Sequence, residues 1–235
     1  MGAGLLPRIL PPKMLCVLDF PTLRKLLEPF GVPLNDRQEQ QLLAYLELLL
    51  KWNAKINLTA IESPEECVTR HFGESLYLTK GLDVSGRLLD IGSGAGFPGL
   101  VLKLANPLLS ITLLEPVAKK RAFLKEVARV CEFGPVVVRG ERLEDFGQTL
   151  HSPRFDLATA RAVGGLEQLV PQAVRCLNPN GLVCLWLGHA QAAELGHIQP
   201  RLDWRPPIPI PLSRGREIWV GSVPESWQHI EPQPP

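Results

Sequence analysis

The chain has 235 residues, of which 45% are hydrophobic and 21% are charged. These fractions are ordinary for a soluble globular protein, and they exclude a disordered chain, a collagen and a coiled-coil rod. With 25 basic against 24 acidic residues, the formal net charge is +1. Bulk charge therefore does not attach this protein to nucleic acids in general, and a nucleic-acid partner would have to be recognised through a local patch.

The five cysteines are widely spaced and include no C-x-x-C pair, so we expect buried free thiols in a reducing compartment. No apolar run reaches the roughly 18 residues that span a bilayer. Three prolines interrupt the apolar start of the chain, which makes it a poor signal peptide, and residues 1–20 are expected to be a flexible leader. We expect a cytoplasmic monomer that binds neither a membrane nor a metal.

Three helical segments are predicted in the first third of the chain. The first, within residues 21–33, carries leucines at helical spacing and ends at a glycine. The second begins after Asn35, where Gln38 is placed as a capping-box partner. The third has Pro64 at its first helical position and continues to about residue 80. Residues 21–81 are therefore predicted to form a helical N-terminal subdomain.

From Arg87 onward, short apolar strands alternate with helices. The predicted strands are 88–91, 111–115, 136–138, 155–159 and 182–187, and the predicted helices are 98–105, 117–131 and 166–177. This alternation predicts an α/β fold with a mostly parallel, doubly wound sheet that is covered on both faces. The proline-rich tail is expected to add one edge strand at 217–220. Residues 82–222 would thus form one domain, followed by a disordered tail at 223–235.

A glycine-rich loop follows the first strand and precedes a helix. Its sequence is Asp90-Ile91-Gly92-Ser93-Gly94-Ala95-Gly96-Phe97-Pro98-Gly99. Glycines let the backbone approach a ligand closely, and Glu115, which closes the next strand, could accept both hydroxyls of a ribose. The glycine spacing fits a dinucleotide site and also the loop of class I S-adenosylmethionine (SAM) methyltransferases. We favour SAM because Asp90 could hold its amino group through water, whereas a dinucleotide has no ammonium there. A turn without a ligand is the third possibility.

Several short motifs accompany this loop in a fixed order. They are Lys51-Trp52-Asn53, Asn57-Leu58-Thr59, Arg70-His71, Lys119-Lys120 and Ala160-Arg161-Ala162-Val163. In this combination, over about residues 30–222, the chain resembles the RsmG family, also called glucose-inhibited division protein B. The family comprises the bacterial small-subunit rRNA (guanine-N7)-methyltransferases. The resemblance implies a Rossmann-like class I SAM-dependent methyltransferase fold behind a helical N-terminal extension. It also implies SAM as cofactor and 16S rRNA or the 30S subunit as partner.

The resemblance and the loop together give a candidate cofactor site. Its residues are Asp90, Gly92, Ser93, Gly94, Gly96, Phe97, Glu115, Leu143, Glu144 and Arg161. In this set the positions carried over from the family are Gly92, Phe97, Leu143, Glu144 and Arg161. Glu74 stands where the family usually has aspartate. Leu187 stands where it usually has a lysine near the end of the fifth strand, a difference that bears on RNA contacts more than on the cofactor.

The implied reaction at guanine N7 needs no general base, because N7 has an in-plane lone pair and carries no proton. It needs N7 held in line with the sulfonium methyl, and Arg161 is the predicted orienting residue. The target guanine, in the decoding-site loop, must be splayed out to reach the pocket. Candidate substrate-binding residues are Arg70, His71, Lys119, Lys120 and Arg121.

Three other functions stay open on the sequence. The first is SAM-dependent methylation of a small molecule or a protein, against which the basic run at 119–121 argues. The second is a non-catalytic SAM-binding module, which Leu187 favours. The third is a nicotinamide oxidoreductase.

Overall fold

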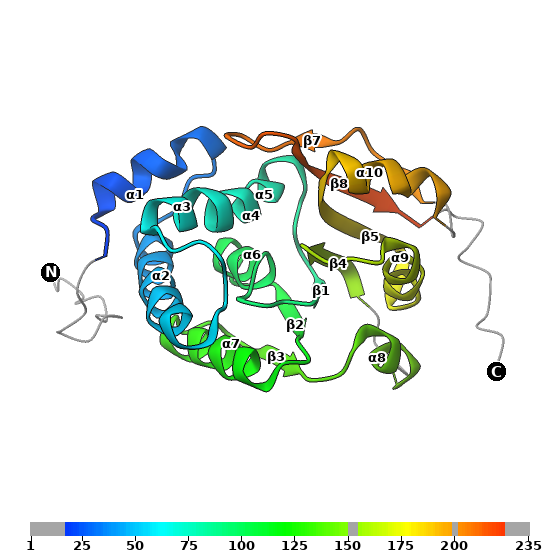
Figure 1. Cartoon of the computed structure of the whole chain (residues 1–235), viewed down its shortest axis with the longest axis horizontal. Helices are drawn as coiled ribbons and strands as arrows, with labels where there is room; N and C mark the ends of the chain where they lie inside the picture. Colours follow the sequence, from blue (N-terminus) through cyan, green and yellow to red (C-terminus); the bar gives the residue numbers. More distant parts are fainter. Residues whose placement is uncertain (1–16, 150–154, 199–201, 224–235) are drawn as a thin grey trace, which may run out of the picture.

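Figure 1 shows the computed structural model, which describes residues 17–149, 155–198 and 202–223. The first helices are α1 (Phe20–Leu27), a 3-10 turn (Glu28–Phe30), α2 (Asp36–Ile56), α3 (Pro64–Cys67), a π-helix (Val68–Gly73), α4 (Glu74–Leu76) and α5 (Leu78–Gly81). The later helices are α6 (Gly99–Ala105), α7 (Ala118–Val130), α8 (Leu143–Thr149), α9 (Leu166–Arg175), α10 (His189–Glu194) and a 3-10 turn (Leu195–His197). The strands are β1 (Arg87–Ile91), β2 (Ser110–Leu114), β3 (Val136–Arg139), β4 (Phe155–Arg161), β5 (Leu177–Gly188), β6 (Asp203–Trp204), β7 (Ile208–Pro209) and β8 (Arg216–Ser222).

Capping confirms the predicted start of α2. The Asn35 side chain accepts a hydrogen bond from the Gln38 N–H at 3.0 Å, and the Gln38 side chain accepts one from the Asn35 N–H at 2.9 Å. The helix continues to Ile56, where Asn57 takes a left-handed conformation with φ of 52°. Such a residue ends a helix because it cannot continue the right-handed backbone.

The folded chain begins before the boundary expected at residue 21. Asp19 caps α1 by accepting from the Thr22 N–H at 2.9 Å, and Leu18 is buried in the core. The remainder of the expected leader, residues 1–16, lies outside the described residues, as do residues 224–235 of the expected tail.

The third predicted helix starts at Pro64 as expected, after the cap Ser63, and reaches Gly81. Its middle is not α-helical, because Val68–Gly73 forms a π-helix. A π-helix bonds each residue to the fifth one along, so its turns are wider, and such turns are rare and frequent at functional sites. This one carries both Arg70 and His71.

The predicted parallel sheet is confirmed. Its strand order is β3-β2-β1-β4-β5-β8-β6, with β7 also paired to β8. Strands β1 to β5 run parallel, and β8 is antiparallel to β5. The order reverses between β1 and β4, which makes the carboxyl ends of these two strands the topological switch point, where open α/β sheets bind their ligands.

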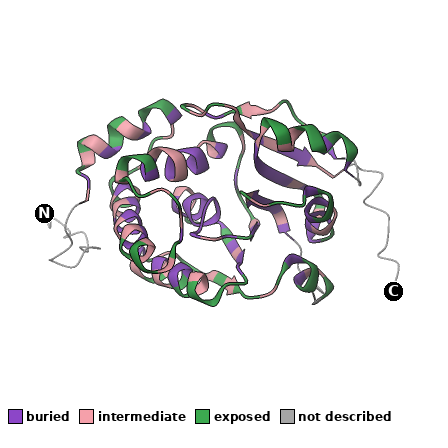
Figure 2. Cartoon of the chain, viewed as in Figure 1, coloured by how far each residue is buried: buried purple, intermediate pink, exposed green. Residues whose placement is uncertain are grey.

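Two hydrophobic clusters cover the two faces of the sheet, and Figure 2 shows buried residues along the strands between them. Successive residues of a strand point to opposite faces, and accordingly Leu88 belongs to one cluster and Leu89 to the other. The first cluster joins the N-terminal helices to α6 and α7, and the second contains α8 and α9. The N-terminal helices therefore share a core with the sheet and hold their side chains fixed beside the switch point.

The C-terminal part differs from the prediction in three respects. The expected edge strand is β8, which is longer and lies inside the sheet, because β6 and β7 pair with its other side. The strand predicted at 182–187 is β5, which already begins at Leu177 and has a register shift against β4 near Leu157. Helices α8 and α10 were not predicted, since their seven and six residues carry little periodic signal.

Four cysteines, Cys67, Cys131, Cys176 and Cys184, are free and buried, as expected. Cys16 lies outside the described residues. Within the described ranges, no helix is both long enough and apolar enough to cross a membrane. The same part of the chain holds no group of three or more His, Cys, Asp or Glu side chains arranged for a metal ion.

Candidate functional site

The glycine loop lies at the switch point, between the end of β1 and the start of α6. Gly92, Gly94 and Gly96 have φ values of 67°, 56° and 88°, a backbone region that residues other than glycine rarely adopt. A Cβ at Gly96 would strike Tyr45 and Leu100, whereas a Cβ at Gly94 would meet nothing nearer than 3.8 Å. Gly96 is therefore a glycine for packing, and Gly94 borders open space where a ligand could approach the backbone.

Glu115 fastens this loop to the next strand. The residue is only 4% exposed and follows β2 directly. Its carboxylate accepts from the Gly94 N–H at 2.9 Å and from the Val117 N–H at 2.8 Å. Each carboxylate oxygen has a second lone pair, so the group can also accept hydroxyls from a ligand at Gly94. The acid therefore contacts the loop, and its predicted bonds to a ribose stay a prediction.

Asp90 supports the loop from beneath. Its carboxylate is fully buried, its Oδ1 accepts from the Thr159 hydroxyl at 2.7 Å, and its Oδ2 lies against the backbone of Gly99. The Ser93 hydroxyl donates a hydrogen bond to the backbone carbonyl of Asp90 at 3.0 Å, which adds a second link between Asp90 and the loop. Burial raises the pKa of Asp90 from 3.8 to about 6, although the hydrogen bonds oppose the shift. Its predicted link to the amino group of SAM stays a prediction.

We expect Asp90→Asn to make stability less dependent on pH. Because the folded pKa of Asp90 lies above the unfolded value, the native state keeps its proton in the window between about pH 4 and about pH 6. The protonated Asp90 side chain therefore stabilises the native state below this window. The stabilisation is lost above the window, where an ionised carboxylate must be buried. The unfolding free energy of the variant relative to the wild type should therefore rise across the window, by about 3 kcal/mol. Denaturant unfolding of both proteins at several pH values measures it. The contributions of all other titratable groups cancel when the wild type is subtracted from the variant. A difference in unfolding free energy that stays constant with pH would therefore contradict a raised pKa of Asp90.

An aromatic stack connects the N-terminal helices to the loop. The Phe97 ring lies between Tyr45 and His71, with ring centroids at 5.5 Å and 4.6 Å and nearly parallel planes. The Tyr45 hydroxyl donates to the Ala95 carbonyl, also in the loop. The Phe97 ring is buried among these aromatic groups, and its predicted contact with the cofactor stays a prediction. The neighbouring side chains fix the loop from the side of the helices.

His71 is held as a neutral ring. Its Nε2 lies 2.7 Å from the Thr59 hydroxyl, which also accepts from the Ile61 N–H. Burial, together with the nearby charges of Arg161, Arg70 and Arg216, lowers the pKa of His71 from 6.5 to about 3. His71 therefore carries no charge near neutral pH, and any contact with a substrate would be a neutral hydrogen bond or a stacking contact.

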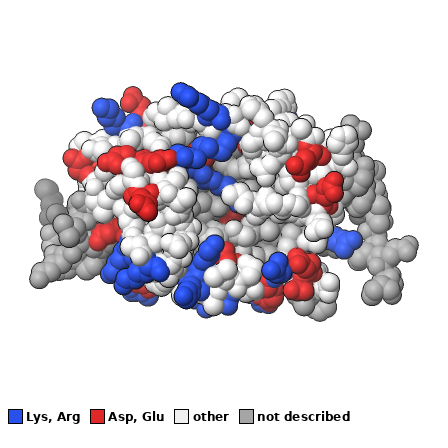
Figure 3. Space-filling view, in the orientation of Figure 1, with Lys and Arg blue, Asp and Glu red and all other residues white. Residues whose placement is uncertain are grey.

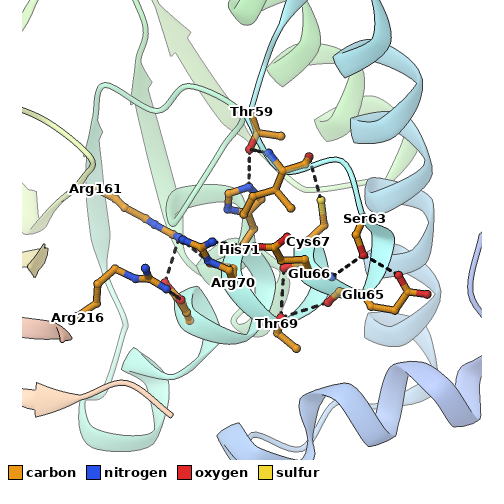
Figure 4. Close-up of polar contacts among 12 residues, drawn as sticks. Thr59, Ser63, Glu65, Glu66, Cys67, Thr69, Arg70, His71, Arg161 and Arg216 are labelled. Atoms are coloured by element: carbon orange, nitrogen blue, oxygen red, sulfur yellow. Dashed lines mark hydrogen bonds and ion pairs between the residues drawn. The ribbon is translucent and has the colours of Figure 1, made fainter. Parts of the chain in front are cut away.

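Arg161, at the end of β4, forms a cluster with two other arginines around one buried acid (Figure 4). Its Nη2 donates to the Arg70 carbonyl at 2.6 Å and to the Glu74 carboxylate at 3.1 Å. Arg216, from β8, donates to the other oxygen of the same carboxylate at 2.5 Å. Burial lowers the pKa of Arg161 to about 10, so the guanidinium stays charged at neutral pH.

The sequence did not indicate Glu74 as the centre of this cluster. It stood out only as a departure from an aspartate, and the structure shows that the acid is used. Glu74 is 2% exposed, and its backbone carbonyl accepts from the Trp186 indole N–H at 2.9 Å. Arg216 was missed as well, because it lies 142 residues from Glu74 along the chain and in no local motif.

The other predicted residues take varied positions. Leu143 is buried in the core at the start of α8, and Glu144 beside it is exposed. Lys119 is exposed and Lys120 is half-buried at the start of α7. Arg121 donates to the carbonyls of residues 115 and 116 at 3.0 Å and 2.6 Å, so it fixes the turn after β2.

Leu187, which stands where the family usually has a lysine, does not lie at the surface. Leu187 is 2% exposed and packs in the core on the face of the sheet covered by α9. A leucine suits this environment, since a buried apolar side chain costs no desolvation of charge. The positive charge on the opposite face comes from Arg161 and Arg216 instead.

Comparisons with known proteins agree on one family. A family model described as rRNA small subunit methyltransferase G matches residues 38–203. The ribosomal RNA small subunit methyltransferase G of Chloroflexus aggregans is 39% identical over 175 residues, which cover 74% of each chain. The protein of the same name from Alkaliphilus metalliredigens is 42% identical over 73% of each chain. A solved ribosomal protein L11 methylase from Lactobacillus delbrueckii subsp. bulgaricus shares the fold, with a TM-score of 0.52, 15% identity, and coverage of 66% of this chain and 78% of that chain.

Proposed function

Because the chain belongs to the rRNA small subunit methyltransferase G family, we propose that it transfers the methyl group of SAM to N7 of a guanine in the decoding-site loop of 16S rRNA. The observation that carries the proposal is the open backbone at Gly94, tied to Glu115 at the switch point of the sheet. Membership in a methyltransferase family also favours SAM over a nicotinamide cofactor. Because the proposed substrate belongs to the small ribosomal subunit, we infer a location in the bacterial cytoplasm.

The residues present fit SAM. The free space beside Gly94 admits a ligand to the loop backbone, and the Glu115 carboxylate is placed to accept ribose hydroxyls. Leu143 and Glu144 offer an apolar side chain and backbone groups for an adenine edge. When bound, SAM supplies an electrophilic methyl group on a positively charged sulfur.

The chain's own residues have to orient the base and exclude water. No proton leaves N7, so no general base is needed. The low pKa of His71 makes this ring a weak base, which agrees with such a reaction. The guanidinium of Arg161 is a planar donor that can hold an acceptor on the base such as O6 of guanine. Its contacts with Glu74 and the Arg70 carbonyl fix its position and leave Nη1 without a partner among the described residues.

The test is methyl transfer from labelled SAM to purified 30S subunits that lack the modification, with the modified position mapped. Label at N7 of one guanine in the decoding-site loop is the expected result. SAM binding without transfer would instead indicate a non-catalytic module. Label on proteins or metabolites but not on rRNA would indicate a methyltransferase of another class.

Arg161→Ala is expected to reduce turnover more than it reduces SAM affinity, because the base loses its orientation at the reacting centre. A decrease of about 100-fold in the single-turnover rate corresponds to about 2.7 kcal/mol. Arg161→Lys should restore little, since lysine keeps the charge but lacks the planar fork of donors. Single-turnover rates on 30S subunits at saturating SAM measure both variants. Full activity of the lysine variant would show that only the charge matters.

A further inference from the structure

Three arginines converge beside the candidate site, and two of them, Arg161 and Arg216, share the buried carboxylate of Glu74. They come from distant parts of the chain: Arg70 from the π-helix, Arg161 from the end of β4 and Arg216 from β8. Figure 4 shows Arg161 and Arg216 directed toward the same point beside Arg70. Figure 3 shows Lys and Arg side chains gathered over α4 and α5, next to a band of Asp and Glu side chains over α3. Glu74 neutralises one of the three charges, and the exposed Glu66 pairs with Arg70 at 2.7 Å. One positive charge remains.

The guanidinium groups also have unused hydrogen-bond donors. The Nε atoms of Arg70 and Arg216 and the Nη1 atom of Arg161 have no partner among the described residues. A buried donor without an acceptor destabilises the folded state, so a cluster with three such donors is poorly satisfied by the protein alone. The side chains of Arg70 and Arg216 stay 43% and 31% exposed, which leaves a path for a ligand from solvent.

The same cluster acts electrostatically on its surroundings. The charges of Arg161, Arg70 and Arg216 all lower the pKa of His71, and Arg70 and Arg216 also lower that of Arg161. The arginines therefore repel protons and one another, which an anion between them would relieve. The cluster lacks hydrogen-bond acceptors for its free donors and a negative charge for its remaining positive charge. A phosphate supplies both, and its oxygens fit the paired donors of a guanidinium group.

We propose that Arg70 and Arg216, held beside Arg161, bind a backbone phosphate of the RNA substrate next to the nucleotide that is methylated. This inference rests on the proposed function, since it places the RNA backbone beside the loop that would hold the methyl donor. The aromatic stack of His71 on Phe97 joins the arginine cluster to that loop, so an anion bound by the cluster would lie beside the loop. The carboxylate of SAM offers the same anion chemistry, and the experiment separates the two sources.

The experiment measures binding of the full-length protein to 30S subunits that lack the modification, by filter binding with S-adenosylhomocysteine present so that no turnover occurs. We expect Arg70→Gln and Arg216→Gln each to raise the Kd for subunits about tenfold. In the double variant, the slope of log K against log salt should become shallower by about 0.7, the contribution of one phosphate contact to a single strand. The affinity for SAM, measured by calorimetry, should stay within about twofold of the wild type.

Arg37→Gln is the matched control. Arg37 lies on α2, is 63% exposed and contacts only the exposed Glu132 at 3.4 Å, among the ion pairs of the described residues. It removes the same charge from a surface that we do not assign to RNA, and its Kd should match the wild type. Arg70→Gln leaves both pairs of Glu74 in place, so this variant decides the question even if Arg216→Gln unfolds.

Subunit affinities of the arginine variants equal to that of Arg37→Gln would overturn the proposal. Loss of SAM affinity with unchanged subunit affinity would also overturn it, because the cluster would then bind the carboxylate of the cofactor. A wild type that binds subunits but transfers no methyl group would refute the proposed function instead. The binding assay does not depend on turnover, so the phosphate site is judged separately.

Discussion

Glu74→Ala is expected to lower the free energy of unfolding by about 3–5 kcal/mol. The substitution removes the only carboxylate that pairs with Arg161 and Arg216 among the described residues, and Arg161 is only 13% exposed. A buried charge that loses its partner keeps its full desolvation cost, which is why breaking such a pair costs more than the pair contributes. Urea unfolding of the two proteins at neutral pH measures the difference.

Two further variants separate charge from packing. Glu74→Gln keeps the shape and an acceptor oxygen, so it should lose less stability than the alanine variant. Glu66→Ala, in the same helical stretch, breaks an exposed pair with Arg70 and should change stability by less than about 1 kcal/mol. If Glu74→Ala and Glu66→Ala were equally mild, the cluster would not depend on its central acid.

The sequence predicted those parts of the fold that are encoded locally. The capping box of α2 is a four-residue signal, and the glycine loop requires only a strand before it and a helix after it. The alternation of strands and helices predicted the parallel sheet, and Glu115 was expected to close the second strand, which it follows directly. Each of these signals spans a few residues or one strand–helix unit.

The parts that the sequence could not predict depend on contacts between distant segments. Glu74 meets Arg161 and Arg216 at separations of 87 and 142 residues, so neither pair leaves a local pattern. The prediction that β8 is an edge strand was wrong, because β6 and β7 pair with its outer side. These strands have two residues each, too few for a periodic pattern in the sequence to reveal them. The π-helix has the composition of an α-helix, and only its packed environment distinguishes it. Phe97 is an aromatic residue in a ligand loop, and only the fold shows that Tyr45 and His71 enclose it.

The strongest effect on the cofactor is expected from Gly94→Val, which should abolish measurable SAM affinity in calorimetry. The backbone at Gly94 has φ of 56°, and the space next to its Cα is free of protein atoms to 3.8 Å. The protein therefore has room for the new side chain, at a backbone strain of about 1–2 kcal/mol. The valine would fill the space that a ligand needs in order to reach the loop backbone, and it would leave the fold intact.

The neighbouring glycines show why Gly94 is the position to change. At Gly96, a side chain would strike Tyr45 and Leu100, so loss of binding there would report only a damaged fold. Gly196→Val is the matched control, because no atom lies within 4 Å of a Cβ at that glycine and it is far along the chain from the loop. The control should bind SAM like the wild type. If Gly94→Val melts within a few degrees of the control, as about 1–2 kcal/mol of strain implies, the loss of affinity belongs to the loop. Affinity retained by a folded Gly94→Val protein would mean that the glycine loop is only a strand–helix turn, and that SAM binds elsewhere or not at all.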